Sequence, residues 1–145
     1  MRLRIRIRFP VPDRVPSGIL DTSVLIDLER IDPSLLPAEV AISSITMAEL
    51  SAGPHATDDL AERGRRLDRL QRAEAAFDPL PFDIEAARAY GRVFAAAMGA
   101  GRKARGQRAV DLLIAAAALS AGLPLFTRNE ADFAAVADLV DIVVV

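Results

Sequence analysis

The sequence predicts an α/β protein whose mainly parallel sheet is covered by helices on both faces. Short apolar runs alternate along the chain with helical patterns, which is the order that parallel strands require. The runs are continuously apolar, as expected for strands that are buried on both faces of a sheet. With 145 residues, of which 52% are hydrophobic and 26% charged, the chain is long enough for one such domain.

The first half of the domain combines predicted strands with three predicted helices. A buried strand over 18–21 comes first, and Thr22 and Ser23 after it are suited to cap a helix that runs to about Arg30. Prolines then mark a loop. The elements that follow are a strand over 40–45, a short helix that Thr46 caps and Gly53–Pro54 ends, and a charged helix over 57–76.

The second half continues the same alternation of strands and helices. A helix over 110–121 is almost entirely apolar, and we therefore expect it to be buried on most sides. The loop before it, 99–107, is rich in glycine and basic residues. The other expected elements are strands over 77–81, 123–127 and 141–145, a helix over 83–98 that Asp83 caps, and a short helix over 129–137.

The first seventeen residues differ from the rest of the chain. Arginine alternates with apolar residues from Arg2 to Phe9, a period typical of a strand, and three prolines then interrupt the pattern. An added edge strand, a basic arm and a tail are all compatible with it. We favour a tail, because the domain pattern begins at Gly18, and divide the chain into an arginine-rich tail, 1–17, and a domain, 18–145.

The composition excludes several kinds of site. The chain has no cysteine and a single histidine, His55, which rules out disulfide frameworks, cysteine nucleophiles and histidine-rich metal sites. A metal site would have to be built from carboxylates, a donor set that selects Mg²⁺ or Mn²⁺. No apolar run reaches the ~20 residues that cross a membrane, and the N-terminus lacks the apolar region of a secretory signal, so we expect a cytoplasmic protein.

Acidic residues follow the predicted strands or begin the helices after them. Each has a structural explanation: Asp21 could cap a helix, Glu49 could complete a capping box with Thr46, and Asp111 could interact with a helix dipole. Carboxylates that gather at the carboxyl edge of a sheet repel each other unless their pKa values rise or cations bridge them. The set therefore favours a carboxylate site for one or two divalent ions. Its candidates are Asp21, Glu49, Asp111 and, after Thr127, the group Asn129, Glu130 and Asp132.

Four motifs, in this order and spacing, resemble those of PIN domains, and most of all the VapC toxins of bacterial VapBC toxin–antitoxin systems. The resemblance covers Gly18 to Val145 and implies a three-layer α/β/α sandwich and a Mg²⁺- or Mn²⁺-dependent endoribonuclease. It also implies a VapB-type antitoxin as partner and a homodimer or larger toxin–antitoxin assembly. The motifs are LDTSVLI from Leu20, ITMAEL from Ile45, DLLIAA from Asp111 and TRNEADF from Thr127.

The resemblance also assigns roles to residues of the site. Three acids fall on the first three metal-site acids of the family: Asp21, Glu49 and Asp111. Asp132 matches the fourth, with Asn129 as a hydrogen-bonding residue at the edge of the site and Glu130 as a weaker candidate. The hydroxyls that match positions near the metal are Thr22, Ser23 and Thr127. The residues expected to guide the RNA backbone are Arg102, Lys103, Arg105 and Arg108, for which a solvated surface is the alternative.

Two other functions are weighed against a nuclease. A phosphotransferase with a haloacid-dehalogenase-like fold would use Asp21 as nucleophile, but that chemistry needs an acid two residues later, where Ser23 stands. A PIN-like module that binds a partner without cutting RNA would keep the fold and have no need of the acids. Cleavage of RNA with and without Mg²⁺ separates these alternatives.

Overall fold

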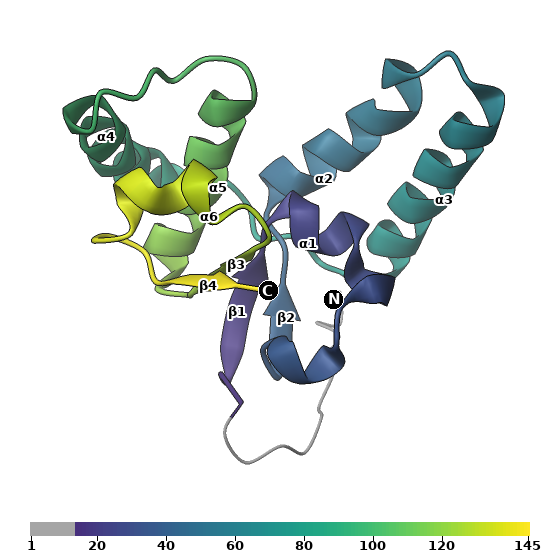
Figure 1. Cartoon of the computed structure of the whole chain (residues 1–145), viewed down its shortest axis with the longest axis horizontal. Helices are drawn as coiled ribbons and strands as arrows, with labels where there is room; N and C mark the ends of the chain where they lie inside the picture. Colours follow the sequence, from purple (N-terminus) through teal and green to yellow (C-terminus); the bar gives the residue numbers. More distant parts are fainter. Residues whose placement is uncertain (1–13) are drawn as a thin grey trace.

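The computed structural model describes residues 14–145, which fold around one four-stranded sheet (Figure 1). All pairings in this sheet are parallel and the strand order is β2-β1-β3-β4, so β1 and β3 lie in the middle. The predicted parallel α/β fold is therefore confirmed. The strands are β1 (Ser17–Leu20), β2 (Glu39–Ala41), β3 (Leu125–Thr127) and β4 (Ile142–Val144).

Each face of the sheet has its own hydrophobic core. Successive side chains of a strand point to opposite faces, so Ile19 and Leu20 of β1 belong to different cores. Ile19 packs with α4 (Ile84–Gly99) and α5 (Gln107–Ala121). Leu20 packs with the helices of the other face, which are α1 (Thr22–Ile26), α2 (Ser44–Ala52) and α3 (Leu60–Ala76). The result is the predicted three-layer α/β/α sandwich, with the two helical layers on either side of the strands in Figure 1.

Short turns of helix complete the connections. The predicted helix from Thr22 to Arg30 divides into α1 and a separate 3₁₀ turn, and the predicted helix over 129–137 divides into α6 and a 3₁₀ turn. The short helical elements of the domain are η1 (Leu28–Arg30), η2 (Pro33–Leu35), η3 (Gly53–Ala56), α6 (Glu130–Phe133) and η4 (Ala134–Val136). None of the helices between residues 14 and 145 is long and apolar enough to span a membrane.

The strand predicted over 77–81 is wrong. Only Leu80 pairs, in a single parallel bridge with Ser43, and its N–H and C=O bond to Ile42 and Ser44. Prolines stand on both sides of Leu80 and have no N–H to donate, so the pairing cannot extend.

The strand predicted over 40–45 and the start of the next helix also need correction. β2 ends at Ala41, and Ser43 caps α2 by accepting a hydrogen bond from the N–H of Thr46. Thr46 is therefore the third residue of the helix rather than its cap. Of the apolar residues after β2, Ile42 is buried in the connection to α2 and Ile45 is a partly buried residue in the first turn of the helix, and a short apolar run does not distinguish a strand from such a segment.

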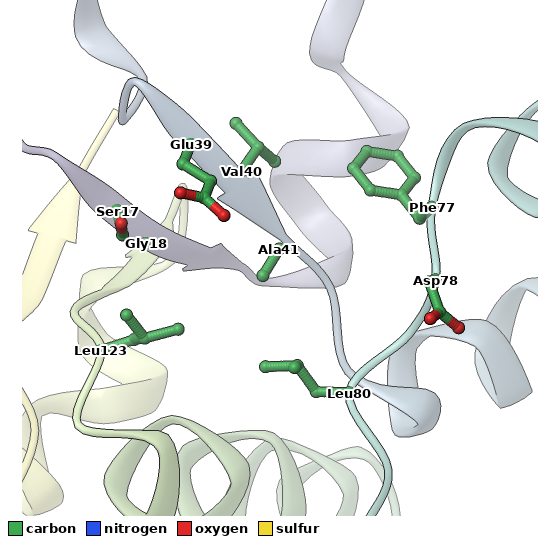
Figure 2. A pocket seen from close by; sticks show the side chains of 9 residues that line it. All are labelled: Ser17, Gly18, Glu39, Val40, Ala41, Phe77, Asp78, Leu80 and Leu123. Carbon is green, nitrogen blue, oxygen red and sulfur yellow. The ribbon is translucent and has the colours of Figure 1, made fainter. Parts of the chain in front are cut away.

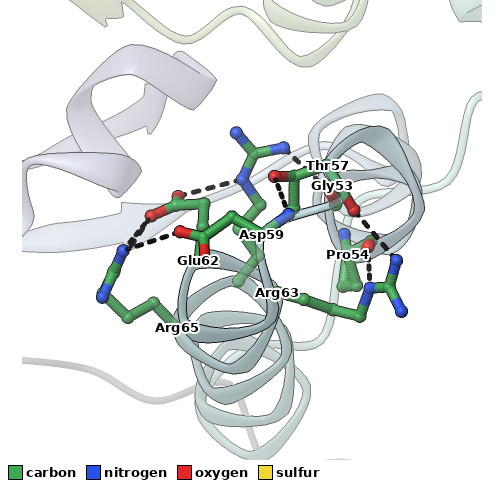
Figure 3. Close-up of polar contacts among 8 residues, drawn as sticks. Gly53, Pro54, Thr57, Asp59, Glu62, Arg63 and Arg65 are labelled. Carbon is green, nitrogen blue, oxygen red and sulfur yellow. Dashed lines mark hydrogen bonds and ion pairs between the residues drawn. The ribbon is translucent and has the colours of Figure 1, made fainter.

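α2 and α3 form an antiparallel pair that extends away from the sheet (Figure 1). At its far end, Arg63 donates to the carbonyls of Pro54 and Thr57, at 3.1 and 3.0 Å (Figure 3). Arg66 donates to the carbonyl of Gly53 at 3.0 Å. Glu62 accepts from Arg65 and Arg66, which hold its pKa below the ordinary value. These bonds fix the turn between the two helices and so help to position α2.

Residues 14–17, the last four of the predicted tail, are joined to the domain. Ser17 begins β1, Val15 packs against the core on the α1 side, and the carbonyls of Val15 and Pro16 accept from the N–H groups of Ala38 and Glu39. Residues 1–13 lie outside the described part of the chain, so the division at 17/18 stays a prediction.

A pair of truncations tests where the domain begins. Removal of residues 1–17 is expected to lower the free energy of unfolding by about 2 kcal/mol relative to removal of residues 1–13, because it deletes two backbone hydrogen bonds and the packing of Val15. The measurement is urea unfolding of both proteins followed by circular dichroism. Equal midpoints would place the start of the stable domain after Ser17.

Candidate active site

The predicted site acids lie at the carboxyl edge of the sheet or on helices that begin there. Asp21 directly follows β1, and Thr127 is the last residue of the neighbouring strand β3. The amino ends of β1 and β2 border a different feature, a hollow that Leu80 and Leu123 also line (Figure 2). None of the predicted site acids lines this hollow.

Asp21 is buried and accepts three hydrogen bonds. Its Oδ1 accepts from the N–H of Thr22 at 2.9 Å, so Asp21 does cap α1. Its Oδ2 accepts from the hydroxyls of Ser23, at 2.8 Å, and Thr127, at 2.9 Å. These hydroxyls are the ones predicted near the site, and they fix the carboxylate at the boundary of β1 and β3.

Glu49 does not belong to a capping box. Since α2 begins after Ser43, Glu49 lies in the second turn, where its carboxylate is free to make contacts outside the helix. Its Oε1 accepts from Thr22 Oγ1 at 2.6 Å, and its Oε2 accepts from Gln107 Nε2 at 3.1 Å. Thr22 directly follows Asp21 in the chain, so the contact with Thr22 brings Glu49 beside Asp21.

Asp111 does not open its helix. α5 begins at Gln107, so Asp111 lies in the second turn, and interaction with the helix dipole does not explain its position. The residue is 6% exposed, and its Oδ1 accepts from Gln107 Nε2 at 3.1 Å. Burial, followed by the charges of Asp21, Asp132 and Glu49, raises the pKa of Asp111 to about 6, against the opposing effect of the Gln107 bond.

The structure thus brings three of the predicted acids, Asp21, Glu49 and Asp132, within electrostatic reach of the fourth, Asp111. Asp132 is exposed on α6, and its charge helps to raise the pKa of Asp111. Glu130 is not among the charges that raise the pKa of Asp111. The role of Asp132 as the fourth acid of the site stays a prediction. Asn129 is also at the edge of the site, where its backbone N–H donates to Thr127 Oγ1 at 3.0 Å.

The carboxylate oxygens of the cluster are suitable ligands for a hard divalent cation, but the side chains are not arranged around a common point in this structure. Among residues 14–145, no three Asp, Glu or His side chains are positioned to hold an ion directly. The oxygens bond instead to hydroxyl and amide donors. Within the same range the Lys and Arg ion pairs involve other acids, so the negative charge of the cluster is not neutralised by a basic side chain.

The predicted RNA-binding residues lie just before Asp111 in sequence, but the structure does not join them to the acidic cluster. Arg102, Lys103 and Arg105 lie in the loop between α4 and α5, and Arg108 in the first turn of α5. Their side chains are exposed or half-buried. No bond links them to the four acids in the described part of the chain, and their role stays a prediction.

Two residues at the site were missed by the sequence analysis. Gln107 contacts both Glu49 and Asp111, and its position four residues before Asp111 is the one signal that pointed to it. Arg128 lies between β3 and α6, where its Nε is 3.5 Å from Asp27 and its backbone N–H donates to Ser23 Oγ at 3.3 Å. Its backbone is therefore joined to the site, within the motif that begins at Thr127, while its charge is paired with Asp27.

The raised pKa of Asp111 predicts that the carboxylate destabilises the metal-free protein at neutral pH. The folded protein binds this proton more tightly than the unfolded chain, because the pKa rises from 3.8 to about 6. Stability from Asp111 is therefore present at low pH and is lost as the pH rises through 6. Asp111→Asn is expected to stabilise the protein by about 1–2 kcal/mol at about pH 7.5, and by less than about a third of that near pH 4.

This prediction is measured by urea unfolding in the presence of a chelator at both pH values. Asparagine keeps an oxygen that can accept the Gln107 bond, so the comparison isolates the charge. A gain of the same size at both pH values would show that the charge of Asp111 is not the cause.

A parallel sheet with carboxylates gathered at its carboxyl edge is the arrangement predicted for a PIN domain, and the PIN-domain profile matches residues 19–139. The chain belongs to the PIN-domain family. Within the family it is similar to VapC proteins: it is 39% identical over 122 residues to ribonuclease VapC5 of Mycobacterium tuberculosis, covering 82% of this chain and 87% of the relative. It is also 33% identical over 126 residues to ribonuclease VapC of Rickettsia bellii, covering 83% and 91%.

Solved structures show the same likeness. The VapBC-5 structure from M. tuberculosis superposes with a TM-score of 0.77 at 39% identity, covering 89% of this chain and 98% of the matched chain. The DNA-bound VapBC of Salmonella typhimurium gives 0.68 at 26% identity, covering 88% and 96%. The predicted resemblance to VapC is therefore confirmed, and the haloacid-dehalogenase-like alternative is excluded by family membership.

Proposed function

We propose that the chain is an endoribonuclease of the VapC type that depends on Mg²⁺ or Mn²⁺ and serves as the toxin of a toxin–antitoxin pair. One observation supports this most: in a PIN fold, Asp21, Glu49 and Asp132 place their charges near the buried Asp111, and within residues 14–145 no Lys or Arg forms an ion pair with these acids. The relatives named ribonuclease VapC support the choice of RNA as substrate.

The cation would be held by Asp21, Glu49, Asp111 and Asp132. When bound, it supplies a water of lowered pKa and relieves the negative charge of the scissile phosphate. The chain itself positions the carboxylates: Thr127 and Ser23 hold Asp21, and Thr22 holds Glu49. A histidine or lysine base is not needed for this chemistry, which agrees with a chain that has one histidine, His55, on the exposed turn η3.

RNA would be bound mainly through its backbone and shape. The basic side chains of the loop before α5, together with Arg128 at the edge of the cluster, would contact phosphates. Platforms for base stacking are scarce, since the whole chain contains one tyrosine, six phenylalanines and no tryptophan.

The partner would be a VapB-type antitoxin. The solved relatives are VapBC toxin–antitoxin structures, and a nuclease of this kind acting in the cytoplasm has to be restrained in its own cell. We further propose that the toxin is present as a homodimer or within a larger toxin–antitoxin assembly.

The experiment that tests this function is cleavage of total RNA by the full chain, with Mg²⁺, with Mn²⁺ and with a chelator. Cleavage is expected with either ion and not with the chelator. Expression of the chain alone should also stop growth of the host, and co-expression of a small neighbouring gene product should restore it. A soluble, folded protein that neither cleaves RNA nor slows growth would support the non-catalytic PIN-like module instead.

A further inference from the structure

Gln107 lies at the point where a cation would neutralise two carboxylates of the site. Its Nε2 donates to Glu49 Oε2 and to Asp111 Oδ1, each at 3.1 Å. A primary amide nitrogen carries two hydrogens, so it can form both bonds at once. One neutral group therefore links two acids whose charges repel each other.

The two carboxylates that Gln107 links come from opposite helical layers. Gln107 and Asp111 lie one turn apart on α5, so their side chains share one face of that helix. Glu49 comes from α2, and its other oxygen is held by Thr22 at 2.6 Å. The amide thus spans the gap between α2 and α5 at the level of the site.

A cation that bridged these two oxygens would compete with the amide for the space between them. Mg²⁺ binds oxygen at about 2.0–2.1 Å, whereas the two N···O distances to Gln107 are 3.1 Å. An ion shared by Glu49 and Asp111 would therefore draw each oxygen inward by roughly 1 Å. The Gln107 side chain is exposed at the first residue of α5, so it can rotate into water without disturbing the core.

We propose that Gln107 is a latch, whose amide holds Glu49 and Asp111 in place while no ion is bound and leaves when a divalent cation binds between them. The proposal rests on the proposed function, since it takes these acids as ligands of the cation. Gln107 is in this sense a positioning residue. It keeps the ion-free site ordered and lowers the affinity of that site for the ion.

The test compares Mn²⁺ binding to the full chain and to Gln107→Ala by isothermal titration calorimetry. The variant is expected to bind Mn²⁺ about five- to tenfold more tightly, because the ion no longer displaces two hydrogen bonds. In a chelator its melting temperature is expected to fall by about 2–4 °C. Gln71→Ala, which changes an exposed glutamine on α3, is the matched control and should alter neither quantity.

A second measurement follows the side-chain amide of Gln107 directly by NMR during titration with Mg²⁺. Its two N–H signals should move to the positions typical of an exposed glutamine such as Gln71 as the ion binds. Equal or weaker Mn²⁺ binding by Gln107→Ala, or amide signals that do not move, would overturn the latch and leave the metal-dependent nuclease standing. Absence of ion binding by the wild-type chain would overturn both.

Discussion

Asp21→Asn is expected to lower the rate of RNA cleavage at least about a hundredfold while the fold is retained. Asp21 is the acid most firmly held at the site, with hydrogen bonds from Thr22, Ser23 and Thr127. Loss of its charge removes one of the ligands proposed for the cation. The measurement is the initial rate of cleavage at saturating Mg²⁺, with circular dichroism to follow the fold.

The structure also predicts how well Asp21→Asn folds. Asparagine has the shape of aspartate and keeps one oxygen, which can still accept from the N–H of Thr22 and cap α1. The hydroxyls of Ser23 and Thr127 can rotate to accept from the new amide, so the change in unfolding free energy should stay within about 1 kcal/mol. Asp58→Asn, in the exposed loop before α3, is the matched control and should cleave RNA normally. Unfolding of Asp21→Asn would instead show that Asp21 is chiefly a structural cap.

Gly18→Ala is expected to lower the free energy of unfolding by about 3 kcal/mol. A Cβ at this position of β1 would lie 2.5 Å from Cε1 and 2.8 Å from Cδ1 of Phe126, and 3.1 Å from Cγ of Pro37. Phe126 is 1% exposed, so its ring has no free space into which to move. Relief of the overlap would have to shift β1 relative to β3, which are paired in the middle of the sheet.

Gly64→Ala is expected to raise the free energy of unfolding under the same conditions. Gly64 lies inside α3 with no atom within 4 Å of an added Cβ, so alanine should stabilise the helix by about 0.5–1 kcal/mol. Urea unfolding of both variants measures the contrast. A neutral Gly18→Ala would mean that the sheet and the Phe126 ring adapt more freely than a close-packed core allows.

The order of strands and helices could be predicted because most of them have a recognisable local pattern of apolar residues. Ile19 and Leu20 are both apolar since each faces a helical layer, and the long apolar stretch of α5 predicts its burial. The position of a cap is harder to predict, because Ser43 and Thr46 are both good cap residues and the choice depends on where β2 ends.

The motifs predict which acids belong to the candidate site, and this membership stays a prediction, but the contacts of these acids could not be predicted. Asp21 directly follows β1, as the sequence suggests, whereas Glu49 and Asp111 lie in the second turns of α2 and α5. Gln107 is different, because its bond to Glu49 joins residues 58 positions apart and arises only when α2 and α5 pack against the same sheet. The sequence likewise does not show that the charge of Asp132, and not that of Glu130, raises the pKa of Asp111.

The strand order has a consequence for when the candidate site is assembled during synthesis of the chain. β3 is synthesised late, yet it lies in the interior of the sheet beside β1. Thr127, the last residue of β3, donates a hydrogen bond to the carboxylate of Asp21. A ribosome that has translated only the first hundred or so residues holds a chain with two strands, Asp21 and Glu49, but without Asp111, Thr127 or Asp132. The nascent chain therefore lacks a complete candidate site until the last part of the domain has been translated. For the toxin proposed above, cleavage of RNA would begin only near release, when an antitoxin can already be present.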